Sequence, residues 1–326
     1  MYMDKLIDMI KTQRNLSETT LKGYFKSLLR LQKIVNLKNV EQFINNNDKV
    51  LDRIKVSYKK PYQLNLINCM IVAIEAWNIN NPDPNLDDDL IIYRKYQMLI
   101  KDELDETKYD QKKNLKEDEN WESWQVLLNM SALNFKVANK ILKRQGEISI
   151  KEGAIVMKWL ISQLYTTGKE NPPLRLDYNN MIVITKEEYE KEHSKTQNYL
   201  VVQSSRTKYF VLHEYKTFKK YGIKSIKLAP VLNRAVNLWL KVKSRIKGID
   251  NNYLLFNNQN NYINESSMSN LISDAFNHTG KKINANLIRH IFITDIANKL
   301  NLAERKVVAE KMCHNVLQSL MYEKNS

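Results

Sequence analysis

The chain has 326 residues, 43% of them hydrophobic, so it is long enough for two domains that each bury a core. Lys and Arg outnumber Asp and Glu by 51 to 36, and the resulting net charge of +15 favours a polyanionic partner such as nucleic acid. Only two cysteines occur, Cys69 and Cys313, which excludes a disulfide framework; we expect both to be buried in a reducing compartment. We recognise no signal peptide or membrane span, so the composition favours a soluble intracellular protein.

A helical N-terminal domain is predicted over residues 1–80. Its second helix is expected from Tyr62 to Trp77. Between the predicted helices lies a basic stretch that is suited to phosphate contacts, or else is a solvated helix face and loop: Lys49, Arg53, Lys55, Lys59 and Lys60. In the first predicted helix, apolar residues recur at helical spacing after the N-cap candidate Ser17: Leu21, Tyr24, Phe25, Leu28, Leu29 and Leu31.

A connection is predicted over residues 81–119. The segment from Asn80 to Asp89 is polar and acidic and contains two prolines, so it should end the first helical domain. From Ile91 to Lys116 the composition favours a charged helix followed by a flexible linker rich in Lys and Asp. An apolar pattern restarts at Trp121, which places the second domain over residues 120–326.

The second domain is predicted to be α+β and mostly helical, with a small antiparallel sheet. Four β-type runs, MIVIT, YLVVQ, KYFVLHEY and IKSIKL, lie between Met181 and Leu228, and helical patterns occupy both flanks. This order fits a sheet inserted among helices better than a doubly wound fold. The sequence has no G-x-G-x-x-G or Walker pattern and no convincing metal cluster. We therefore expect the protein to bind no nucleotide, no metal and no other cofactor.

Three short segments in the last part of the sequence together form a recognisable pattern of motifs. Asn286-Leu-Ile-Arg289-His290 is followed 25 positions after Arg289 by Lys-Met-Cys-His314, and Tyr322 comes eight positions after His314. The segments resemble the H-x-x-R-H box, the G-H box and the tyrosine of the tyrosine recombinases, or phage integrases, in the family's order and at about its spacing. The resemblance covers residues 120–326, and residues 1–80 only as a loosely similar helical DNA-clamping domain.

Two upstream segments extend this resemblance. Pro-Pro-Leu-Arg175-Leu-Asp-Tyr resembles the first arginine box, in the form found in integrase-like proteins of virophages and large DNA viruses. His-Glu-Tyr-Lys216-Thr-Phe resembles the β-hairpin that carries the family's catalytic lysine, with Lys219 and Lys220 as nearby alternatives. The resemblance thus implies a catalytic set: Arg175, Lys216, Asn286, Arg289, His314 and Tyr322.

The resemblance implies that Tyr322 attacks a DNA phosphodiester, forms a 3′-phosphotyrosine and releases a 5′ hydroxyl. Fixed guanidinium groups suit the charge that develops on the phosphate oxygens, which is the role implied for Arg175 and Arg289. Lys216 would protonate the leaving oxygen, and His314 would bond a non-bridging oxygen or orient the phenol. Because the covalent bond conserves the energy of the phosphodiester, rejoining needs no ATP or metal.

The sequence departs from the family pattern at two positions. Asn286 stands where His or Lys is usual; its amide can donate a hydrogen bond to phosphate but cannot transfer a proton. Tyr178 replaces an acidic residue often found three positions after the first arginine, which leaves Asp177 as the expected support of the histidine network. His290 is interpreted as a residue that caps or buttresses its helix.

The leading hypothesis is an integrase or resolvase that joins two double-stranded DNA sites as a homotetramer. A type IB topoisomerase or a telomere resolvase shares the covalent chemistry, and the residues alone do not separate these enzymes. A non-catalytic basic DNA-binding protein with a degenerate site is the alternative from a different class, and Asn286 makes it plausible.

Overall fold

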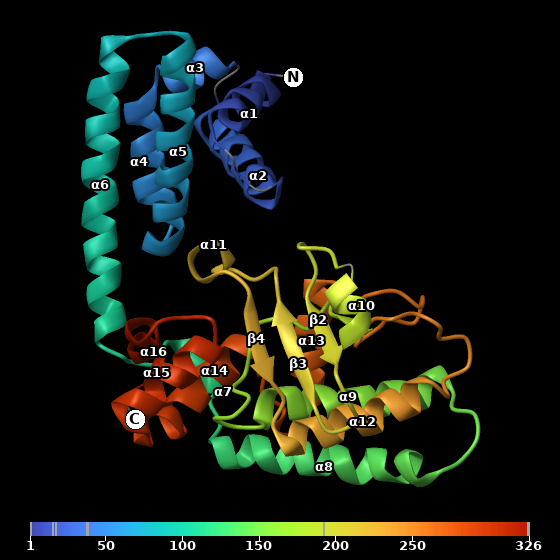
Figure 1. The fold of residues 1–326 in the computed structure, drawn as a ribbon. Helices are drawn as coiled ribbons and strands as arrows, with labels where there is room; N and C mark the ends of the chain where they lie inside the picture. The colour runs from blue at the N-terminus through green and yellow to red at the C-terminus, as the bar shows by residue number, and fades with distance from the viewer. Residues whose placement is uncertain (1, 15, 17, 37–38, 192, 325–326) are drawn as a thin grey trace. The chain divides into compact units, whose positions relative to one another are not determined.

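In the computed structural model the chain divides into two compact units, Met1–Asp110 and Gln111–Ser326. The structure describes residues 2–14, 16, 18–36, 39–191 and 193–324, so the predicted N-cap Ser17 lies outside the described residues. Each unit has its own hydrophobic core. The fold is α+β and mostly helical, as the sequence predicts (Figure 1).

The first unit is a helical bundle around one buried helix. Helix α5 is apolar on nearly all sides, and the other long helices of the unit pack around it. The helices are α1 (Tyr2–Gln13), α2 (Glu18–Val35), α3 (Val40–Ile44), α4 (Asn47–Ser57), α5 (Lys60–Asn80) and α6 (Pro84–Tyr109).

Helix α6 is longer than the charged helix predicted from Ile91, and it occupies most of the predicted connection over residues 81–119. It begins at Pro84, a favoured first helical residue, and the side chain of Asp83 accepts a hydrogen bond from the backbone N–H of Asn85 at 2.9 Å. Its buried residues Leu86, Tyr93 and Ile100 recur every seven positions. Because this buried stripe is narrow, most of the helix faces solvent, and its many charged residues give it a composition similar to that of a linker.

Most helices of the second unit come before or after the sheet segment in the sequence, whereas the short helices α10 and α11 lie between its strands. Several helices begin at Ser or Asn N-caps, including Ser123, Ser149 and Asn284. The helices are α7 (Leu115–Asn120), α8 (Trp124–Lys143), α9 (Ile150–Thr166), α10 (Lys186–Lys191), α11 (Phe218–Tyr221), α12 (Pro230–Lys243), α13 (Glu265–Ala275), α14 (Ala285–Asp295), α15 (Leu302–Lys311) and α16 (Val316–Tyr322), with 3-10 turns at Asn277–Thr279 and Ala297–Lys299.

The four strands lie within the predicted β-type runs, but their sheet is mixed instead of antiparallel. The strands β1 (Ile182–Thr185), β2 (Tyr199–Val202), β3 (Lys208–Leu212) and β4 (Lys224–Lys227) are hydrogen-bonded in sequence order. Strand β1 pairs parallel with β2, whereas β2 with β3 and β3 with β4 are antiparallel. The crossover that contains α10 lets the chain enter β2 in the direction of β1.

One face of the sheet joins the main core of the second unit. Leu200, Phe210 and Ile226 belong to the same buried cluster as side chains of α9 and α12, which lie along this face in Figure 1. Trp239 of α12 is fully buried, and its indole N–H donates to the carbonyl of Leu254 at 2.8 Å. The opposite face carries a smaller apolar cluster of Tyr199, Val201 and Val211.

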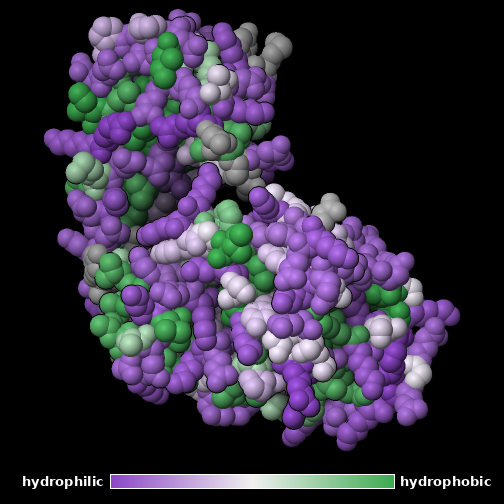
Figure 2. Space-filling view, in the orientation of Figure 1, coloured by the Kyte–Doolittle hydropathy of each residue, from purple (hydrophilic) through white to green (hydrophobic). Residues whose placement is uncertain are grey.

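The outer surface of each unit is mainly polar on the side shown in Figure 2, with smaller apolar areas among the hydrophilic residues. Both cysteines are buried, as predicted. Among the described helices, none combines the length and the apolar character that crossing a lipid bilayer requires.

Residues 111–326 should fold without the first unit, because their core is separate. We expect this fragment to unfold in one cooperative thermal transition, monitored by circular dichroism. A fragment starting at Asn120 should be less stable by about 1–3 kcal/mol, because it loses Glu117, whose carboxylate bonds His290 at 2.7 Å. A non-cooperative transition of the longer fragment, or equal stability of both fragments, would contradict this expectation.

Candidate active site

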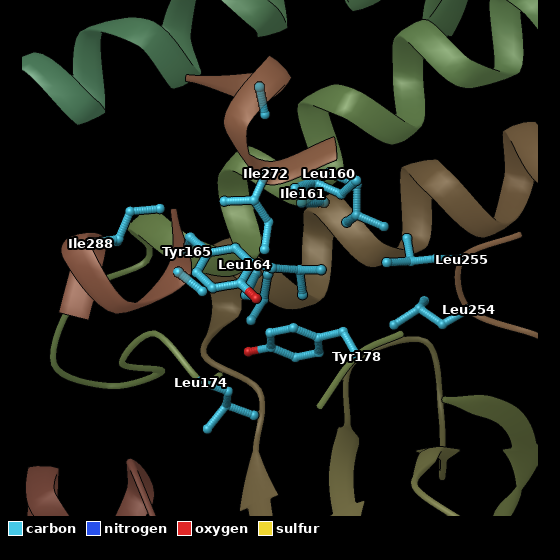
Figure 3. Close-up of a cluster of buried hydrophobic side chains, with 14 of the residues drawn as sticks. Leu160, Ile161, Leu164, Tyr165, Leu174, Tyr178, Leu254, Leu255, Ile272 and Ile288 are labelled. Carbon is cyan, nitrogen blue, oxygen red and sulfur yellow. The ribbon is translucent and has the colours of Figure 1, made fainter. Parts of the chain in front are cut away.

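The loop that carries Arg175 is fixed by two hydrogen bonds to its backbone. Tyr165 of α9 donates its hydroxyl to the Arg175 carbonyl, and the Asp177 carboxylate accepts from the Arg175 N–H at 3.1 Å. The rings of Tyr165 and Tyr178 meet edge to face with centroids 5.8 Å apart, and Figure 3 shows both among buried aliphatic side chains. The half-buried Arg175 therefore extends from a rigid part of the core.

Arg289 of α14 is fully buried, with 0% of its surface exposed. Its Nη1 donates to the carbonyl of Pro173 at 2.7 Å and its Nη2 to that of Met312 at 3.3 Å, while Nε has no partner among the described residues. Burial, and then the nearby charge of Arg175, lowers the pKa of the Arg289 guanidinium, which still keeps its proton at neutral pH. A permanent charge is thus held between the Arg175 loop and the end of α15.

The turn after α15 brings His314 to the site. Cys313 has a φ of 59°, in the left-handed region that favours glycine, and the His314 N–H donates to the Ala309 carbonyl at 3.1 Å. The Thr217 hydroxyl donates to the Cys313 carbonyl at 2.7 Å. This bond ties the segment that carries Lys216 to the His314 turn.

Tyr322, the last residue of α16, lies among these side chains. Nη2 of Arg175 donates to its hydroxyl oxygen at 3.4 Å, and the guanidinium carbon of Arg289 lies 5.7 Å from the centre of its ring. The His290 ring centroid is 4.5 Å and the His314 ring centroid 5.5 Å from that of Tyr322. The two arginines, His314 and Tyr322 therefore meet at one place.

The charges around Tyr322 change its acidity. Burial by itself raises the pKa of the phenol, but the charges of Arg289 and Arg175 and the hydrogen bond from Arg175 lower it, with a further contribution from Lys216. The net result is a pKa below the ordinary value for tyrosine. The site thus makes the phenol more acidic than that of an ordinary tyrosine and makes it easier to form the phenolate, which is the nucleophilic form of the side chain.

The predicted lysine and asparagine occupy exposed positions. Lys216 follows β3 and acts on Tyr322 through its charge, whereas Lys219 and Lys220 in α11 are not among the charges that shift the Tyr322 pKa. Asn286 is exposed in the first turn of α14. The structure thus groups Lys216 with the site and leaves the Asn286 amide without a bond to the site side chains described above.

Asp177 supports the arginines, which corrects the prediction that it supports a histidine network. Its carboxylate bonds the backbone of Arg175, a local contact two residues away, and burial raises its pKa against the opposing charges of Arg289 and Arg175. Neither ring nitrogen of His314 has a hydrogen-bond partner within the described ranges. The Asp177 carboxylate thus accepts its hydrogen bond from a backbone amide in its own loop and not from His314.

Sequence reasoning missed one residue of this region, Glu117 of α7. Its Oε1 bonds Nδ1 of His290 at 2.7 Å, and its Oε2 lies 3.5 Å from Nζ of Lys324. The only sequence signal is the capping box of Asn114 and Glu117, which predicts a helix start and nothing about a site. His290, predicted to buttress its helix, instead connects this carboxylate to the Tyr322 ring.

The grouped side chains form a cationic site around a phenol. Arg175, Lys216 and Arg289 supply three positive charges, while Asp177 supplies a half-buried carboxyl group. Such an arrangement can hold a phosphate and polarise the tyrosine hydroxyl. Within the part of the chain that the structure describes, no group of three or more His, Cys, Asp or Glu side chains could hold a metal ion.

The buried His314 should make stability depend on pH. Burial, followed by the charges of Arg289 and Arg175, lowers its pKa to about 3, whereas an unfolded histidine titrates near about 6.5. The unfolded chain then binds more protons between these values, so stability present above pH ~6.5 is lost as pH falls, by up to about 1.4 kcal/mol per pH unit. Urea unfolding of residues 111–326 at several pH values between ~4 and ~7 gives the free energy of unfolding as a function of pH. This free energy should change less steeply with pH in His314→Gln than in the wild type. Equal pH dependence would contradict a neutral His314 in the folded state.

No protein-family model matches the sequence, and no curated protein matches it. Among solved structures, the crystal structure of XerA recombinase is similar at a TM-score of 0.36 and 13% sequence identity, over 100% of this chain and 94% of that chain.

Proposed function

We propose that the chain cuts and rejoins DNA strands through a covalent bond between Tyr322 and a DNA 3′ phosphate. The observation that carries the proposal is the position of the Tyr322 hydroxyl, 3.4 Å from the Arg175 guanidinium and beside the buried Arg289 charge. Free tyrosine, with a pKa near about 10, is a poor nucleophile at neutral pH. The arginines lower the pKa of this tyrosine and would also bind the phosphate that it attacks.

In the proposed step, Tyr322 gives up its phenolic proton to solvent, and its oxygen forms a bond to phosphorus as the bond from phosphorus to the DNA 5′ oxygen breaks. Arg175 is half-buried and can offer donors to the phosphate oxygens, while Arg289 acts as a fixed charge because its Nη atoms bond carbonyls. Lys216 donates a proton to the departing 5′ oxygen. Attack by a DNA 5′ hydroxyl on the phosphotyrosine reverses the step, rejoins the strand and frees Tyr322.

The proposed substrate is double-stranded DNA, with two sites joined by a homotetramer, as in integration or site-specific recombination. The net charge of +15 supports a polyanionic partner. In the first unit, Lys49, Arg53 and Lys59 are exposed on or beside α4, where they can contact phosphates. We assign a DNA-clamping role to residues 1–80 and the strand chemistry to residues 120–326.

Replacing the nucleophile should separate binding from cleavage. Tyr322→Phe removes only the hydroxyl, so covalent adducts should disappear while DNA affinity changes less than about twofold. The assay uses a pool of nicked duplexes with randomised sequence, and adducts are detected as labelled DNA that stays with denatured protein. Tyr221→Phe in α11 is the matched control and should form adducts like the wild type.

Each alternative outcome identifies a different function. Adducts that persist in Tyr322→Phe would remove this residue as the nucleophile. Wild-type protein that binds DNA but never forms an adduct would be a non-catalytic DNA-binding protein. Relaxation of a single supercoiled circle without strand exchange between paired sites would indicate a type IB topoisomerase.

Sulfur substitution should distinguish the lysine from the arginines. If Lys216 protonates the leaving oxygen, Lys216→Ala should cleave ordinary DNA slowly but recover most of its rate on a bridging 5′ phosphorothiolate, because sulfur leaves without a proton. Arg175→Ala should cleave both substrates at least about 100-fold more slowly than wild type, because the phosphate charge still needs stabilisation. Rescue of Lys219→Ala or Lys220→Ala in place of Lys216→Ala would identify a neighbour as the acid.

A further inference from the structure

We propose that Glu117 is a positioning residue that holds Tyr322 beside the arginines through His290 and Lys324. The inference rests on the proposed role of Tyr322 as the nucleophile and adds a residue that lies far from it in the sequence. Glu117 belongs to α7 near the start of the second unit. It touches neither the phenol oxygen nor the arginines in the contacts described above, so its action is indirect.

The first arm of this arrangement runs through His290. Nδ1 of His290 bonds Glu117 Oε1 at 2.7 Å, and the His290 ring lies 4.5 Å from the Tyr322 ring, centroid to centroid. A carboxylate that accepts from one ring nitrogen fixes both the orientation of an imidazole and the place of its proton. Glu117 therefore fixes the ring against which Tyr322 packs.

The second arm holds the chain just after Tyr322. Nζ of Lys324 lies 3.5 Å from Glu117 Oε2, and the backbone N–H of Lys324 donates to the Thr294 hydroxyl at 2.9 Å. Before the tyrosine, the Leu320 carbonyl accepts a hydrogen bond from the Gln111 side chain at 3.0 Å. The peptide is thus held on both sides of Tyr322.

Burial makes the Glu117 contacts stronger than ordinary surface pairs. The side chains of Glu117, His290 and Lys324 are 14%, 17% and 12% exposed, so water screens their charges only partly. Burial by itself raises the pKa of Glu117, but the bonds to His290 and Asn114 and the charge of Lys324 lower it to about 2. The carboxylate is therefore ionised at neutral pH and can contact His290 and Lys324 at the same time.

The helix that carries Tyr322 needs such external support. Helix α16 spans seven residues, Val316–Tyr322, and a helix of this length has little stability on its own. The single bond from Arg175 to the phenol is 3.4 Å long. Because a displacement of about 1 Å can cost on the order of 100-fold in rate, loss of the Glu117 contacts should appear first in catalysis.

The test compares Glu117→Ala with Glu119→Ala in the full chain. Glu119 lies on the same helix and is exposed, so it matches the charge change without the contacts. We expect Glu117→Ala to slow adduct formation on the nicked duplex pool by roughly tenfold or more, with DNA affinity within about twofold of wild type. Glu117→Gln, whose amide oxygen can still accept from His290, should recover part of the rate, and Glu119→Ala should match wild type.

A second measurement reports the position of Tyr322 without using activity. In protein labelled with ¹³C on the tyrosine rings, the signal lost in Tyr322→Phe identifies Tyr322, and the adjacent His290 and His314 rings set its chemical shift. Glu117→Ala should move this signal, and Glu119→Ala should leave it in place. An unmoved signal and an unchanged rate in Glu117→Ala would overturn the inference even if wild-type protein forms adducts. A moved signal in a protein that never forms adducts would support the positioning and reject the proposed function instead.

Discussion

The buried charge of Arg289 is the interaction on which the site depends. An isolated charge in a protein interior is costly, so the surrounding chain must supply partners. The carbonyls of Pro173 and Met312 do so, and they belong to the two segments that lead to Arg175 and His314. One guanidinium therefore organises both sides of the site, and the Asp177 carboxyl group lies close enough to oppose part of its charge.

The same positive field has opposite effects on two neutral side chains. It disfavours a second positive charge and thereby helps keep His314 unprotonated, while it favours the negative form of Tyr322. A neutral imidazole with no partner on either ring nitrogen within the described chain can still donate or accept a hydrogen bond.

Much of this arrangement could be predicted from the sequence because the signals are local. Helical periodicity and β-type runs located most elements, and short motifs marked Arg175, Lys216, Arg289, His314 and Tyr322, which the fold brings together. Strand direction leaves no trace in such runs, so the parallel pair of β1 and β2 was not predicted. Helix α6 begins earlier than the charged helix predicted from Ile91, because the two prolines and the acidic residues between Asn80 and Asp89 indicated a connection.

Individual contacts between residues far apart in the sequence could not be predicted from these local signals. Glu117 is 173 positions from His290, and neither local sequence predicts the bond between the two side chains. Asp177 was predicted to support the histidine because Tyr178 occupies the position of the family's usual acidic residue, whereas the folded chain gives its carboxylate a backbone donor in its own loop. Which of several competent partners a polar group takes is decided by the packing of the whole domain.

Cys313 has a left-handed backbone conformation in the turn after α15. Its φ of 59° keeps the left-handed turn that delivers His314, although the residue is not glycine and the backbone carries strain on the order of 1 kcal/mol. Burial of the Cys313 side chain offsets part of this strain, because a glycine would have no side chain to bury. The position of His314 therefore depends on the backbone conformation of this turn, which a cysteine adopts here without a glycine.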